Sequence, residues 1–109
     1  MALSQGNVSS GPFGLTMRAW GLINGATGAL VSGQGMAGSS RSSAGSYAFT
    51  LSSALASTSV LVVVRPSGIA AAGSNFYRGN MSSTTVGAIY TEVAGIATDM
   101  AYVHVEVWA

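Results

Sequence analysis

The stretch Tyr102–Trp108, YVHVEVW, alternates strictly between valines and larger polar or aromatic residues. In an extended chain, successive side chains point to opposite faces, so Val103, Val105 and Val107 share one face. β-branched and aromatic residues also favour strands over helices. The stretch therefore predicts a half-buried β-strand, with the other face formed by Tyr102, His104, Glu106 and Trp108.

Two further segments carry strand patterns of different kinds. The segment 46–51 places Tyr47, Phe49 and Leu51 on one face and small residues on the other, as in a half-buried strand. The run 60–64 (VLVVV) is apolar throughout and is followed by Arg-Pro-Ser-Gly at 65–68. It predicts a strand that is buried on both faces, lies at the centre of a sheet and ends in that turn.

Weaker strand patterns complete an all-β reading. They lie at 16–23, 29–37, 75–78 and 84–91, each bounded by Gly, Asn, Ser or Thr. Asn24-Gly25 is a hairpin signal, and a longer loop through Gly28 is the alternative. We expect a compact antiparallel sandwich or barrel-like domain of about 6–8 short strands over residues 15–109. Residues 1–14 are expected to form an extended N-terminal arm that either frays or lies on a neighbouring subunit.

The composition is poor in charge. Charged residues make up 6% of the 109 residues, 49% are hydrophobic, the net charge is +1, and the chain has no cysteine. A free monomer with so few charges is expected to self-associate, which predicts a homo-oligomer. The four arginines form no basic stripe, so nucleic acid is not an expected partner. The sequence has no membrane-length apolar run and no signal-peptide pattern at its start.

Two patterns resemble sites of chemistry. His104 and Glu106 share a strand face, with Asp99 nearby, which are residue types of an acid–base pair or partial metal site. One histidine and three acidic residues supply few ligands, so we expect no catalysis and no bound metal, and treat the pair as interface groups whose contact is sensitive to pH. The segment 33–38 matches G-x-G-x-x-G, but a serine-rich segment follows in place of a helix, so no cofactor is expected.

Large aromatic residues, together with one arginine and the histidine, are the candidate contact residues. The aromatic side chains are expected to anchor the core or a subunit interface, and the alternative is that they stack against a glycan. The segment 76–78 follows Gly-Ser-Asn and is the best candidate for an exposed receptor contact. The interface or receptor-contact candidates are Trp20, Phe76, Tyr77, Arg78, Tyr102, His104 and Trp108.

Three segments together resemble a known family. Residues 18–28 (RAWGLINGATG), 45–51 (GSYAFTL) and 99–108 (DMAYVHVEVW) are similar to a β domain found at the ends of tailed-bacteriophage fibre proteins. The resemblance implies a non-enzymatic, oligomeric, trimeric β unit on the virion surface, made in the host cytoplasm without a signal peptide.

The chain departs from that family in one respect. Fibre proteins carry an attachment domain and a long shaft, whereas 15 residues precede Thr16 here. If Met1 is the natural start, a capsid decoration or cement protein that contacts other virion proteins is expected. If the chain is a fragment, the alternative is a tail-fibre tip that binds a host-surface receptor or glycan.

Overall fold

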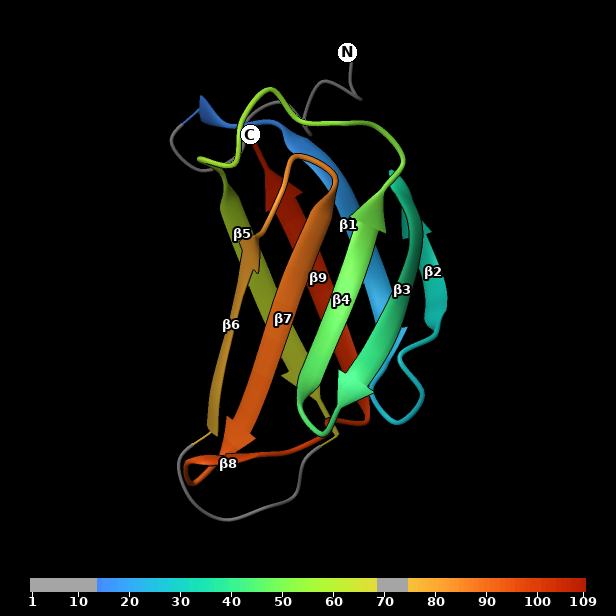
Figure 1. Cartoon of the computed structure of the whole chain (residues 1–109), viewed down its shortest axis with the longest axis vertical. Helices are drawn as coiled ribbons and strands as arrows, with labels where there is room; N and C mark the ends of the chain where they lie inside the picture. Colours follow the sequence, from blue (N-terminus) through green and yellow to red (C-terminus); the bar gives the residue numbers. More distant parts are fainter. Residues whose placement is uncertain (1–13, 69–74) are drawn as a thin grey trace.

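In the computed structural model, residues 14–68 and 75–109 are described, and they form two antiparallel sheets packed face to face (Figure 1). The first sheet has the strand order β2-β1-β9-β5, and the second has the order β3-β4-β7-β6, with β8 paired to β7. This confirms the predicted all-β, antiparallel fold. The described residues contain no helix long and apolar enough to cross a membrane.

The strands within these residues number nine, slightly more than expected. Their bounds are β1 Met17–Asn24, β2 Leu30–Gln34, β3 Met36–Ser43, β4 Ser46–Leu51, β5 Leu61–Ser67, β6 Asn75–Met81, β7 Val86–Val93, β8 Ile96–Ala97 and β9 Tyr102–Trp108. The N-terminal arm expected at residues 1–14 lies outside the described residues except for Gly14.

The core lies between the two sheets and comes from the alternating strands. Val103, Val105 and Val107 on β9 are fully buried, and Tyr47, Phe49 and Leu51 on β4 belong to the same core cluster from the second sheet. Ile89 on β7 is also fully buried. The period-two patterns thus predicted the inward faces of both central strands correctly.

The prediction for residues 60–64 is wrong in three respects. The strand β5 lies at the end of its sheet, next to β9 only, so it is not the centre. Of its valines only Val64 is buried. The strand also continues past Arg65 and Pro66 to Ser67. Proline lacks an N–H group, and an edge strand tolerates this because one of its sides has no hydrogen-bonded neighbour.

The segment expected as one strand at 29–37 is divided at Gly35. Gly35 has φ 76°, which glycine adopts without steric cost, and here the chain passes from β2 in the first sheet to β3 in the second. The serine-rich residues that follow belong to strand β3, where the sequence suggested no regular element. The G-x-G-x-x-G match is therefore part of a strand-to-strand corner.

The connection after β1 is the longer alternative of the two that the sequence offered. The amide of Gly28 donates to the carbonyl of Asn24, and the amide of Asn24 donates to the carbonyl of Ala29. The positive φ is at Gly28, at 80°, and neither Asn24 nor Gly25 has one. A two-residue Asn-Gly turn is therefore replaced by a wider loop.

Candidate interaction surface

The outward-facing rows of β1, β9 and β5 form a largely apolar surface, which we call the outer face of the first sheet. Residues directly opposite each other in an antiparallel pair share a face. Glu106 on β9 lies between Trp20 on β1 and Val63 on β5, and His104 lies between Leu22 and Arg65. The surface comprises Trp20, Leu22, Leu61, Val63, Arg65, Tyr102, His104, Glu106 and Trp108, with the polar Asn24 and Ser67 on either side of Tyr102 at one end.

The carboxylate of Glu106 is at the centre of this face and is only 14% exposed. It accepts hydrogen bonds from Nη1 of Arg65, from Nε2 of His104 at 2.9 Å and from Nε1 of Trp108 at 3.0 Å. Burial raises the pKa of Glu106, but the three donors outweigh burial and hold this pKa below its ordinary value. Glu106 is therefore an ionised, well-satisfied acceptor at neutral pH and a poor proton donor.

The indole of Trp20 is stacked on the imidazole of His104. Their ring centroids are 6.0 Å apart, and the ring planes differ by 26°. The two rings therefore support each other on the outer face, and Trp20 stays partly exposed.

Asp99 does not join His104 and Glu106 as its position in the sequence suggested. It accepts hydrogen bonds from Nε of Arg41 at 2.9–3.0 Å, from the amide of Gly45 at 2.8 Å and from the hydroxyl of Tyr47 at 3.0 Å. Nη2 of Arg41 also lies 2.9 Å from Asp99. These contacts connect β3, β4 and the segment before β9. The guanidinium of Arg41, more than any other group, holds the pKa of Asp99 below its ordinary value.

The hydroxyl of Tyr47 gives a prediction for alkaline pH. Burial, followed by the bond to Asp99, raises the pKa of Tyr47 from 10.0 to about 12. Because the pKa is raised in the folded state, the protonated Tyr47 hydroxyl stabilises the fold. This contribution to the free energy of unfolding is complete below pH 10 and is lost as pH rises through about 12. Absorbance of tyrosinate, followed against pH, should show one late-titrating phenol that disappears in Tyr47→Phe. Titration of all phenols near the ordinary value in the folded protein would contradict this.

The other candidates lie on β6, in the second sheet. Phe76 and Tyr77 are 53% and 46% exposed, so both are accessible, as the sequence suggested. They point to opposite faces, since Tyr77 lies opposite the fully buried Thr91. The guanidinium of Arg78 lies 4.5 Å from the ring centroid of Tyr90, a cation–π contact. The candidates therefore form two groups, with Trp20, Tyr102, His104 and Trp108 together on the first sheet.

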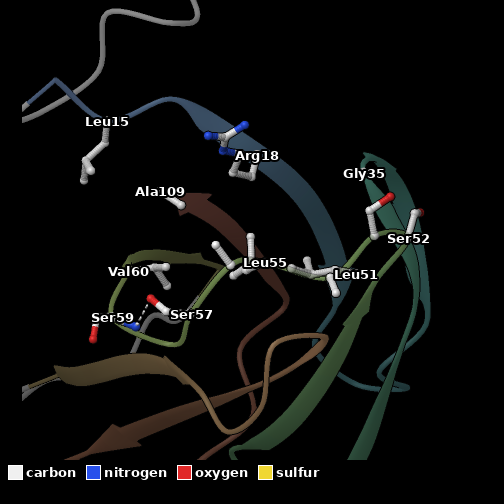
Figure 2. A pocket seen from close by; sticks show the side chains of 13 residues that line it. Leu15, Arg18, Gly35, Leu51, Ser52, Leu55, Ser57, Ser59, Val60 and Ala109 are labelled. Carbon is white, nitrogen blue, oxygen red and sulfur yellow. Dashed lines mark hydrogen bonds between the residues drawn. The ribbon is translucent and has the colours of Figure 1, made fainter.

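A hollow of about 590 Å³ lies at one end of the sandwich (Figure 2). Leu51, Leu55 and Val60 supply apolar lining, serines of the loop 52–60 supply hydroxyls, and Arg18 supplies a charged group at one side. The sequence did not indicate this hollow, because no strand pattern covers residues 52–59.

Arg65 is the charged residue of the outer face that the sequence did not indicate, and the apolar Leu22, Leu61 and Val63 were also not expected there. Arg65 was placed in a turn after a buried strand, whereas it is the outward neighbour of His104 on β5. The hydrophobicity pattern gave no clear signal, because Val62, Val63 and Val64 are all apolar and do not alternate with polar residues.

Comparison of the chain with known protein families, with characterised proteins and with solved structures finds no match. The phage-fibre resemblance therefore remains a prediction from the three sequence segments.

Proposed function

We propose that this protein is a non-enzymatic structural unit on the surface of a tailed-bacteriophage virion, a self-associating β domain that decorates or cements the capsid. The observation that carries the proposal is the outer face of the first sheet. Most side chains in its rows are apolar. The charges of Arg65 and Glu106 on this face cancel, because the two side chains form an ion pair. Such a surface can lose water without leaving a charge unpaired. The assignment to a phage rests on the sequence resemblance.

The carboxylates support a structural role over an enzymatic one. Glu106 and Asp99 each accept several hydrogen bonds, and each has a pKa held below its ordinary value. A general acid or base works best with a pKa near the working pH, which requires the opposite shift in a carboxylate. These groups stabilise the fold and its surface.

The second candidate function is a tail-fibre tip that binds a host-surface receptor or glycan. The exposure of Phe76 and Tyr77 favours it, since exposed aromatic side chains are typical contact residues.

Antibodies raised against the purified chain, coupled to gold, test the two candidates on particles released from cells that carry the gene. Labelling spread over the capsid is the expected result and supports decoration. Labelling confined to the tail supports the fibre tip and overturns the capsid role. Particles that carry none of the protein, with the chain found only in the cell lysate, overturn both.

A further inference from the structure

We infer that the outer face of the first sheet pairs with the same face of a second copy of this chain, across a two-fold axis that brings each Arg65 opposite the partner's Glu106. The inference rests on the proposed self-association and specifies its surface and symmetry. It uses the register of three neighbouring strands, β1, β9 and β5.

The apolar rows suit a second sheet face. Trp20, Leu22, Leu61 and Val63 flank the central strand and are each only partly buried by their own chain. Two sheets that pack face to face bury such rows about 10 Å apart, as they do in the interior of a sandwich. No lysine interrupts the face, and the chain has none.

The charges on this face suit an identical partner. One cation, Arg65, lies beside one anion, Glu106, on an otherwise uncharged strip of the face, next to His104. A single positive–negative pair is complementary to itself after a half-turn, because the rotation exchanges the two positions. A partner with an excess of one sign would leave one member of the pair opposed by like charge.

Arg65 can make a second contact of this kind. Its side chain is 62% exposed, whereas that of Glu106 is 14% exposed. Within the described residues, Nη1 is the nitrogen of Arg65 that donates to Glu106. A guanidinium carries five N–H donors, so further donors remain for the carboxylate of the partner copy. The result is a ring of four alternating charges across the interface.

Light scattering over a range of concentrations tests the surface, with matched variants Val63→Asp and Val86→Asp. Val63 faces outward on the first sheet and Val86 faces outward on the second, and both are partly buried. We expect the wild type to have the mass of two copies. Val63→Asp should raise the dissociation constant of the pair about a hundredfold, whereas Val86→Asp should change it by no more than about twofold. Circular dichroism verifies that each variant folds.

Complementary charge reversals test the axis. Arg65→Glu alone and Glu106→Arg alone should each weaken pairing, because each puts like charges together. Mixed in equal amounts, they should associate with each other, since the two-fold axis then places opposite charges across the interface. A contact that is only internal to one chain gives no rescue on mixing. Absence of rescue with both variants folded would overturn the inference.

The outcomes separate this inference from the proposed function. A wild-type protein that stays monomeric at all concentrations overturns self-association itself. A wild type that associates, but is weakened by Val86→Asp and not by Val63→Asp, overturns the surface and leaves self-association standing. A mass of three copies agrees with the trimer that the resemblance implies and overturns the two-fold pairing.

Discussion

Replacing Asp99 with alanine is expected to lower the free energy of unfolding by about 2 kcal/mol, mainly through the part-buried hydrogen bonds, since the ion pair with Arg41 is screened by solvent. Asp99 accepts hydrogen bonds from Arg41, Gly45 and Tyr47, three residues that are more than 50 positions earlier in the chain. The variant leaves the buried amide of Gly45 without this acceptor and the guanidinium of Arg41 without its counter-charge. The Tyr47 hydroxyl retains the carbonyl of Gly25 at 2.7 Å, which limits the loss.

Urea denaturation measures this effect, with Glu92→Ala as the control. Glu92 lies on the outward row of β7, and its loss should change the free energy by no more than about 0.5 kcal/mol. The difference between Asp99→Ala and wild type should also shrink in acid. The folded-state pKa of Asp99 is lowered from 3.8, so its contribution is complete above that pH and is lost as pH falls through the lower folded value. If Asp99→Ala and Glu92→Ala had equal free energies of unfolding at neutral pH, the proposed role of Asp99 would be contradicted.

The strands with strict alternation could be predicted from the sequence because one face of each is buried. On β9 and β4 the apolar residues recur at every second position, and these residues form the core. A purely apolar run carries no such information. Residues 61–64 are all apolar, although β5 lies at the end of its sheet, so periodicity could not distinguish a central strand from an edge strand.

The side-chain clusters depend on register, which the sequence does not display. His104 and Glu106 could be paired in advance because they are two residues apart on one strand. The third partner, Arg65, is 41 positions from Glu106, and Arg41 is 58 positions from Asp99. Pairs so distant meet only through strand order, and many strand orders are compatible with the same alternating pattern.

Gly87 is the site where the smallest change should have a large effect. It lies directly opposite Phe49 in the β4–β7 register, and the Phe49 ring is fully buried over it. A Cβ atom on Gly87 would lie closer than 3.0 Å to three atoms of that ring, a distance that real Cβ atoms essentially never show. The backbone φ of Gly87 is not positive, so space alone decides the outcome. We expect Gly87→Ala to lower the free energy of unfolding by about 3 kcal/mol.

A double-mutant cycle with Phe49→Leu distinguishes this overpacking from a general cost of altering β7. If the ring is the obstacle, Gly87→Ala should cost about 1 kcal/mol in the Phe49→Leu background, a coupling of about 2 kcal/mol. The matched control is Gly38→Ala on β3, where a Cβ atom meets nothing within 4 Å, and which should be neutral or slightly stabilising. Equal costs for Gly87→Ala with and without Phe49 would mean that the cost arises in β7 itself and not from a clash with the ring.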